Sequence, residues 1–394
     1  MGSPSLSFRD YYLNQRKNRM IKLIIINLLL VYFIFTSCDS KNNRIEIIEI
    51  DIENFHEVSF FDIFSNVEII PLETNEQSLI KDITKVAFYE NKYFILDYGK
   101  GEILIFDTQG NFLNKISDKG QGPNQYLTVN DFDIDYSRDV LTFLSPVNNS
   151  MYEYDLKGNF RTKYKLPNIK SAYNRFKYLN KDTLVFWTFD YNNRIKFFSK
   201  NKNIIFREIY PEKDNILNNF TLSIFPYKNF FCRSACNTVY EITSNAEIIE
   251  KYKWDFMNLN NKRREIKKFE EIPSYELPDY INKIVNSDLI NYIFSLHGGN
   301  SQYYYAQILR KTERINIFHD KTNNKNYTFK KTIENAAFHP LFWYEDYVIG
   351  FYSDVLGTIE ETLPDAILDN KSIRIKEQLN EYDNPVLIKY HFKK

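Results

Sequence analysis

Short, mainly apolar runs recur along the chain, and each run leads into a polar turn. Residues 103–116 and 151–164 both contain an apolar strand, a turn with Asp and Gly, and a second strand. Glycine tolerates positive φ, and an Asp side chain bonds to the turn backbone, so both segments predict β-hairpins. The aligned motifs, 48 residues apart, are Phe106-Asp107-x-x-Gly110-Asn111-Phe112 and Tyr154-Asp155-x-x-Gly158-Asn159-Phe160.

The hairpin motif returns in weaker form further along the chain. Copies begin at Phe198 and Ile242, each 44 residues after the preceding one, and further strands lie upstream, as at 93–97 and 184–187. A period of about 40–50 residues with several strands is typical of propeller blades. No blade carries the Gly-His…Trp-Asp signature of WD-type propellers, so the repeat is of another kind.

The repeat predicts an all-β fold, a six-bladed β-propeller of four-stranded antiparallel blades. Residues 66–71 form the outer strand of the last blade and close the ring, which hides its open edges. A segment of about 258–296, rich in Lys, Glu and Asn, is a partly helical insertion between blades four and five. Blade six is the least regular, so counts of five or seven stay open. The blades are placed at 83–118, 129–166, 172–210, 222–254, 302–330, and 341–351 with 385–390.

The N-terminus predicts export. A run from Leu23 to Phe35, apolar except for Asn27, follows several basic residues and is shorter than the roughly 20 residues of a bilayer-spanning helix. Residues 1–37 are therefore interpreted as a signal peptide, with 1–19 as a start-site overcall if translation begins at Met20. Residues 38–65 are a tether and lead-in, and the propeller occupies 66–394.

The end of the signal peptide, Phe35-Thr36-Ser37-Cys38, resembles a bacterial lipobox, although Phe35 stands where an aliphatic residue is usual. This resemblance implies that Cys38 receives lipid and anchors the chain to a membrane. The alternative is a plain signal peptide or a short anchor with an incidental cysteine. No acidic run follows Cys38, so an outer-membrane anchor facing the periplasm is favoured over surface display.

Further motifs in order along the chain support a family resemblance. Together with the lipobox they resemble the six-bladed β-propeller lipoproteins of anaerobic Gram-negative gut bacteria, a family similar to NHL-repeat propellers. The resemblance implies the fold and an envelope location, because most members have no assigned activity. The motifs are Glu68-Ile69-Ile70-Pro71-Leu72-Glu73-Thr74, Tyr93-Phe94-Ile95-Leu96-Asp97, Gly120-Gln121-Gly122-Pro123-x-x-Tyr126 and Asp383-Asn384-Pro385-Val386-Leu387.

The amino-acid composition limits the classes of partner that the protein can bind. The 394 residues include 51 basic and 51 acidic side chains, and this zero net charge argues against nucleic acid as a partner. Aromatic residues make up 17% of the chain, and they favour strands.

Of the three cysteines, Cys232 and Cys236 are separated by one residue too many for a redox C-x-x-C motif. The pair either forms a disulfide across a hairpin or remains as free thiols.

Two groups of residues are candidates for chemistry. Asp131, Asp133 and Asp135 share one face of a strand, which suits either a weak cation site or acids at the channel end of an inner strand. Tyr303, Tyr305 and Trp343 form a candidate stacking platform for a ligand, with packing between blades as the alternative.

The glycine-rich Gly120–Pro123 segment suits a tight crossing between blades better than a phosphate cradle, since Pro123 removes a donor. The five histidines lack the spacing of a helical zinc motif, and we expect no cofactor.

These observations favour a lipid-anchored, non-catalytic binding module of the cell envelope. Its partner would be a glycan, a peptide or another envelope protein. Nucleic acid is not expected as a partner. The alternatives are an envelope enzyme, either a polysaccharide lyase or hydrolase or an NHL-like metal-dependent lyase, and a purely architectural subunit. No Gly-x-Ser-x-Gly elbow is present to support a serine hydrolase.

Overall fold

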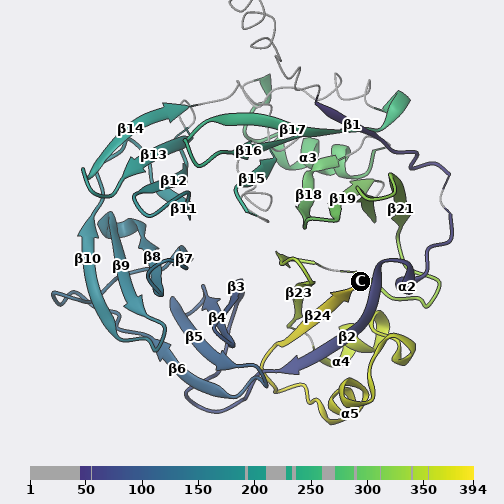
Figure 1. The fold of residues 1–394 in the computed structure, drawn as a ribbon, viewed down its shortest axis with the longest axis horizontal. Coiled ribbons are helices and arrows are strands. Elements are labelled where there is room, and N and C mark those ends of the chain that lie inside the picture. Colours follow the sequence, from purple (N-terminus) through teal and green to yellow (C-terminus); the bar gives the residue numbers. More distant parts are fainter. Residues whose placement is uncertain are drawn as a thin grey trace, which may run out of the picture. The chain divides into compact units, whose positions relative to one another are not determined.

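The strands of the computed structural model form six four-stranded sheets. The sheets follow one another around a central axis in chain order, which confirms the predicted six-bladed propeller (Figure 1). The described residues are 45–54, 56–190, 194–209, 228–232, 237–259, 271–287, 291–310, 312–338, 340–353 and 355–394.

Blades one to three are continuous in sequence, and in each the strand order runs from the channel to the rim as an antiparallel meander. Blade one comprises β3(Ile83–Tyr89), β4(Lys92–Asp97), β5(Glu102–Asp107) and β6(Phe112–Ile116). Blade two comprises β7(Asp131–Asp135), β8(Val140–Ser145), β9(Ser150–Asp155) and β10(Phe160–Lys165), with a 3-10 turn at Pro146–Asn148. Blade three comprises β11(Tyr173–Tyr178), β12(Thr183–Thr188), β13(Ile195–Ser199) and β14(Ile204–Ile209).

Blades four and six each take their outer strand from the N-terminal segment. Blade four comprises β15(Phe230–Cys232), β16(Thr238–Ile242), β17(Ile248–Asp255) and β1(Glu46–Glu49). Blade five comprises β18(Asn291–Gly299), β19(Tyr303–Arg310), β20(Glu313–Asp320) and β21(Lys325–Phe329). Blade six comprises β22(Phe342–Trp343), β23(Tyr347–Tyr352), β24(Val386–Phe392) and β2(Phe64–Pro71).

The repeated Asp-Gly turn shapes the outer hairpin of blades one and two. Asp107 accepts hydrogen bonds from the backbone amides of Gln109 and Asn111, and Asp155 does the same in blade two. Gly110 has a φ of +86°, and a Cβ there would lie 1.9 Å from the carbonyl oxygen of Pro71. Glycine is therefore required both by the turn and by its close approach to the neighbouring blade.

β2 closes the ring by pairing antiparallel with β24, as the sequence predicts. Asn384, which is 3% exposed, holds the closure together. Its side-chain oxygen accepts the amide of Ile80, and its side-chain nitrogen donates to the carbonyls of Glu73 and Ser78. The Asn-Pro-Val ending of the chain therefore has a structural role.

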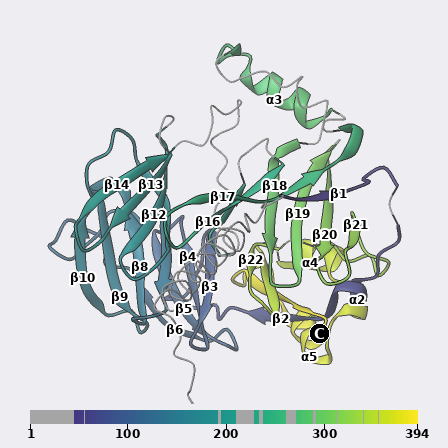
Figure 2. The same ribbon diagram turned by 45° about the horizontal axis from the view of Figure 1, so that its top comes forward.

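The structure differs from the sequence-based boundaries at two places. β1 lies inside the segment predicted as a tether, yet it pairs in parallel with β17 and completes blade four. The predicted insertion overlaps β18, which begins at Asn291. Its partly helical character is confirmed by α3(Leu277–Val285), which lies outside the sheets (Figure 2).

Short helices cover the rim of blade six. α2(Phe60–Ile63) leads into β2, while α4(Val355–Thr362), a 3-10 turn at Asp365–Ile367 and α5(Asn370–Gln378) lie between β23 and β24 in the chain. The hydroxyl of Ser372 in α5 accepts the amide of Ile69, so the open edge of β2 is satisfied. No helix in the described part of the chain is both long and apolar enough to cross a bilayer.

Candidate functional site

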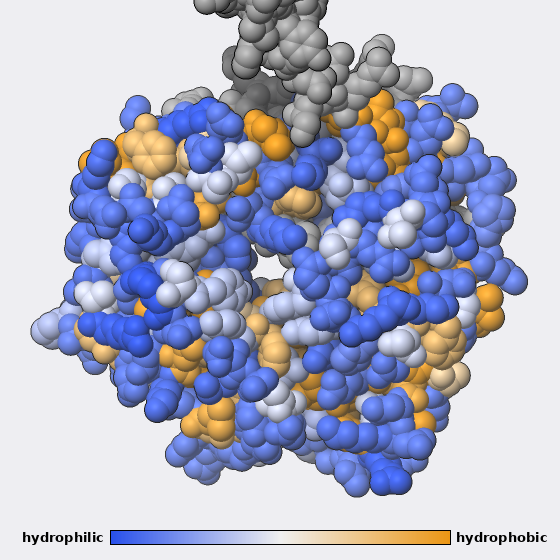
Figure 3. Space-filling model, viewed as in Figure 1, coloured by the Kyte–Doolittle hydropathy of each residue, from blue (hydrophilic) through white to orange (hydrophobic). Residues whose placement is uncertain are grey.

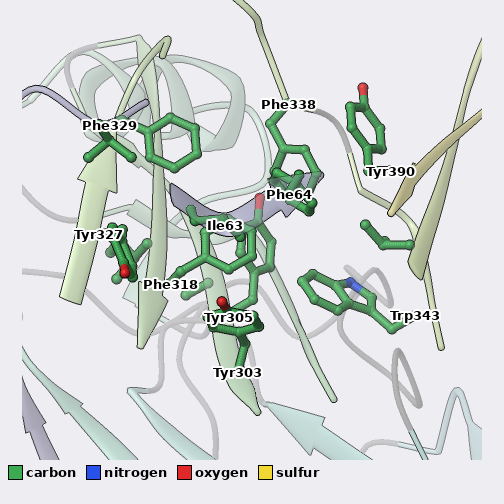
Figure 4. Packing of buried hydrophobic residues seen from close by; sticks show 14 of the residues in the cluster. Ile63, Phe64, Tyr303, Tyr305, Phe318, Tyr327, Phe329, Phe338, Trp343 and Tyr390 are labelled. Carbon is green, nitrogen blue, oxygen red and sulfur yellow. The ribbon is translucent and has the colours of Figure 1, made fainter. Parts of the chain in front are cut away.

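The predicted stacking platform lies in the interior. Tyr303, Tyr305 and Trp343 are 2%, 0% and 7% exposed and surround Phe318 between blades five and six (Figure 4). The Tyr305 hydroxyl donates to the side-chain oxygen of Asn316 at 2.7 Å. These residues cannot stack on a ligand from solvent, because both faces of a propeller blade are covered by its neighbours. The prediction of a platform at these positions is therefore wrong, and inter-blade packing explains them.

Asp131 in β7 links three blades. Its carboxylate lies 2.9 Å from the Lys85 ammonium of blade one and 3.8 Å from the Arg175 guanidinium of blade three. It also accepts the buried amide of Phe176 at 2.9 Å. The carboxylate is only 2% exposed, so these partners compensate its burial.

The other two acids of β7 are paired in the same way. Asp133 lies 2.8 Å from the ammonium of Lys177, and Asp135 lies 2.6 Å from the guanidinium of Arg138. Each of the three carboxylates thus has a cationic partner from the chain itself. Their arrangement does not fit a cation site, and among the described residues no three His, Cys, Asp or Glu side chains are grouped to hold a metal ion.

The histidines of the described strands belong to different strands, namely β18, β20 and β24. His297 is 4% exposed, and desolvation lowers its pKa to about 3. His319 bonds to Asn326, and His391 lies 3.4 Å from Glu68. His339 lies outside the described residues.

The cysteine predictions fall partly on residues outside the described ranges. Cys38 and Cys236 both lie there, so lipidation and the disulfide stay predictions. Cys232 is buried, and its sulfur lies 3.4 Å from the carbonyl oxygen of Thr238. The Gly120–Pro123 segment forms the expected tight crossing, in which the Tyr126 hydroxyl contacts the carbonyls of Gly101 and Ile116.

Tyrosines stand at the end of the inner strand in four of the blades. Tyr89 and Tyr178 are the last residues of β3 and β11, while Tyr136 and Tyr344 directly follow β7 and β22. Inner strands line the axis of a propeller, so their ends surround a mouth of its central channel. Tyr178 is drawn into the interface of blades two and three, where its hydroxyl lies 2.9 Å from that of Thr142.

The other three gather with a fourth tyrosine, and we call Tyr89, Tyr136, Tyr344 and Tyr347 the mouth tyrosines. The rings of Tyr89 and Tyr136 meet edge to face, 4.9 Å apart at 77°. The rings of Tyr344 and Tyr347 are stacked 4.8 Å apart. The two pairs are joined by the amide of Phe88, which donates to the Tyr344 hydroxyl at 2.6 Å.

The mouth tyrosines are in contact with water although protein surrounds them. Tyr136 is 54% exposed, yet desolvation raises its pKa, and desolvation raises that of Tyr344 further. Both observations hold for a side chain that lines a concave opening. Figure 3 shows an opening at the centre of the ring of blades.

Charged groups border the mouth tyrosines on both sides. The Tyr89 hydroxyl donates to Asp139 at 2.8 Å, and this hydrogen bond raises the pKa of Tyr89 to about 12. The Lys389 ammonium lies 4.1 Å from the centroid of the Tyr347 ring. Lys177 forms an ion pair with Asp133 of β7, the strand that Tyr136 directly follows, and both charges act electrostatically on Tyr136. The arrangement offers aromatic faces, hydroxyl groups and both signs of charge within one opening.

The sequence analysis did not identify this cluster, although a signal for it exists. Each of Tyr89, Tyr136 and Tyr344 is followed by a short polar turn and then the second strand of its blade. An alignment built on the inner strands would have shown the recurring tyrosine. The alignment on the Asp-Gly turn of the outer hairpin leaves that position out.

Comparisons with known proteins agree with the fold. The model of the domain of unknown function DUF4934 matches residues 43–391. A crystal structure of a candidate exported protein from Bacteroides fragilis is 17% identical, with a TM-score of 0.67, covering 88% of this chain and 100% of that one.

A member of the DUF4221 family from Bacteroides vulgatus is 11% identical, with a TM-score of 0.53, covering 86% of this chain and 99% of that one. No curated protein matches the chain. At these identities the solved structures show the shared propeller fold alone. Because the family model spans most of its length, the chain belongs to the DUF4934 family.

Proposed function

We propose that the chain is an exported, lipid-anchored binding module of the cell envelope without catalytic activity, and that its ligand binds at the mouth tyrosines. The observation that carries the proposal is the exposed Tyr136 ring beside Tyr89 at the channel opening. Apolar bodies with polar tips suit the recognition of amphipathic ligands, and binding sites gather in such openings. The ligand is a glycan, a peptide or another envelope protein.

Export is supported by the N-terminal apolar run and by the likeness to a candidate exported protein. Anchoring is supported by Cys38 at the end of that run. Metabolic labelling with an alkyne fatty acid tests it directly: the native chain takes up label and Cys38→Ala does not. Label retained by Cys38→Ala would contradict lipidation at this residue.

Binding is tested with the full chain, purified in detergent and applied to arrays of glycans and peptides. Tyr136→Ala should lose the signal that the native chain gives. Tyr98→Ala is the matched control, because Tyr98 is 51% exposed and follows β4, which runs antiparallel to β3 and ends at the opposite side of the ring. Equal binding by both variants would place the ligand elsewhere, and product release from any bound glycan would contradict the absence of catalysis.

A further inference from the structure

The mouth tyrosines present a corner rather than a flat surface. The rings of Tyr89 and Tyr136 stand at 77° to each other, so together they offer two walls to a small ring-shaped group. Tyr136 keeps more than half of its surface exposed, whereas Tyr344 and Tyr347 are half-buried. The corner therefore has one open aromatic face, which suits the C–H face of a saturated ring better than a second flat aromatic system.

Charged groups of both signs border the corner. The exposed carboxylates of Glu90, Asp139 and Asp346 help to raise the pKa values of Tyr89 and Tyr347. The ammonium of Lys177 pairs with Asp133, and this pair keeps the pKa of Lys177 raised despite its burial. The ammonium of Lys389 lies over the ring of Tyr347.

This mixture of charges disfavours ligands of a single charge. An anion would meet the carboxylates of Glu90, Asp139 and Asp346, and a cation would meet the ammonium groups of Lys177 and Lys389. An uncharged polyol suits both, because each of its hydroxyls can donate to a carboxylate or accept from an ammonium. A purely apolar group would exclude water from these charged groups without offering them a hydrogen bond, and would therefore lose affinity.

The opening also limits how a long ligand can bind. The mouth lies at the end of the inner strands, so walls from blades one, two and six enclose it. The end of a polymeric ligand can enter such an opening, whereas an internal segment of the polymer can only lie across the mouth.

We propose that the mouth tyrosines form a subsite for one terminal, uncharged sugar residue, stacked on Tyr136 with its hydroxyls toward Lys177 and Asp139. This inference rests on the proposed function and narrows it from a ligand of several classes to a glycan end. A proline-rich peptide, which also packs on tyrosine, has no hydroxyls to satisfy the ammonium and carboxylate groups and is the competing ligand in the test.

The test uses isothermal titration calorimetry on the full chain in a polyoxyethylene detergent, because alkyl glycoside detergents present sugar head groups. Glucose, galactose and mannose are each compared with the matching uronic acid and 2-amino sugar. We expect heat with at least one neutral sugar and about tenfold weaker binding of its charged counterparts. Equal or tighter binding of the uronic acid, or of the amino sugar, would overturn the proposal.

End recognition is tested on the epimer that binds. For glucose, a linear maltooligosaccharide is compared with the cyclodextrin of the same length, which has no ends. The linear sugar should bind and the ring should not, and equal binding would contradict entry of a terminal residue.

Variants separate this inference from the proposed function. Tyr136→Ala should weaken sugar binding at least about tenfold, Tyr136→Phe should weaken it less, and Tyr98→Ala should leave it unchanged. If a proline-rich peptide binds in a Tyr136-dependent way while no sugar does, the proposed binding function is supported and the sugar subsite is contradicted. If neither ligand depends on Tyr136, the sugar subsite is contradicted, and the proposed function is contradicted as well if Tyr136→Ala and Tyr98→Ala bind equally on the arrays.

Discussion

Blades one to three contact each other through buried ion pairs as well as hydrophobic clusters, whereas blades five and six contact each other through a cluster of aromatic rings. In the charged interfaces, Asp131, Asp133 and Glu153 are each paired with lysine or arginine from a neighbouring strand or blade. In the aromatic interface, Phe318 lies at the centre of a cluster of rings (Figure 4). One repeat thus supports two kinds of inter-blade contact.

The difference shows what a propeller interface requires. Hydrophobic contacts are non-directional and tolerate changes of shape, so ring closure by distant segments in blade six can rely on them. Ion pairs with backbone amides, such as Asp131 with Phe176, are directional and fix how one blade sits against the next. The mouth tyrosines lie next to the charged side, where the inner strands are held in register.

The largest effect is expected in the aromatic interface. Phe318→Ala removes a fully buried ring that touches Phe64, Tyr305 and Trp343, and should lower the free energy of unfolding by about 3–5 kcal/mol. Urea denaturation measures the change. Phe206→Ala, at a ring that is 48% exposed, is the control and should change it by less than about 1 kcal/mol. Similar losses for both variants would show that the cluster is not a stabilising centre.

A smaller loss is expected in the charged interface. Asp131→Ala leaves the buried amide of Phe176 without its acceptor and should cost about 1–3 kcal/mol. Lys85 and Arg175 retain 24% and 27% exposure, so water compensates part of their lost partner. Asp131→Asn, which keeps an acceptor, should cost less in the same denaturation experiment. A larger cost for Asn than for Ala would contradict this account.

Glu153 and Tyr305 should lose their contributions to stability at opposite ends of the pH scale. Burial alone would raise the pKa of Glu153, but hydrogen bonds from Arg138 and Lys200 hold it below its usual value of 4.5. Its stabilisation is therefore present above that value and is lost as the pH falls through the lower folded pKa. Burial raises the pKa of Tyr305 above 10, so the contribution of this residue is lost as the pH rises beyond 10.

Thermal unfolding across the pH range checks this comparison. Glu153→Gln should flatten the acid limb and leave the alkaline limb unchanged, and Tyr305→Phe should do the reverse. The idea fails if either variant changes both limbs equally.

The smallest effect on stability is expected at the mouth. Tyr136→Ala removes a ring that is 54% exposed and should change the free energy of unfolding by about 0.5 kcal/mol or less, although it abolishes ligand binding. A melting temperature measured beside the binding assay separates the two effects. A large drop in stability would mean that Tyr136 is a packing residue.

The blades could be predicted because their turn chemistry is local. Asp107 and Gly110 recur as Asp155 and Gly158, and the register of each hairpin follows from them. β1 could not be predicted, since only Ile48 of its four residues is buried and no alternation marks it. Its strand conformation depends on a partner more than 200 residues away.

The site was missed for a related reason. In a propeller both faces of a strand are buried, so aromatic residues such as Tyr303 and Tyr305 give no sign of exposure in their alternation. Whether an aromatic side chain is exposed depends on its position at the end of a strand. Sequence patterns locate the ends of short strands poorly. The acids of β7 share a face as expected, but their partners, such as Lys85 and Lys177, come from other blades.

The pairing of β2 with β24 determines when the propeller ring can close. The ring needs residues 64–71 and 386–392 together, so residues up to 392 have to be synthesised or transported before blade six exists. A chain that crosses a membrane N-terminus first thus keeps an open ring until residues 386–392 arrive. Loss of residues 386–394 alone would remove β24 and leave β2 without its partner strand. The unpaired edge of β2 would then be open to aggregation and proteolysis.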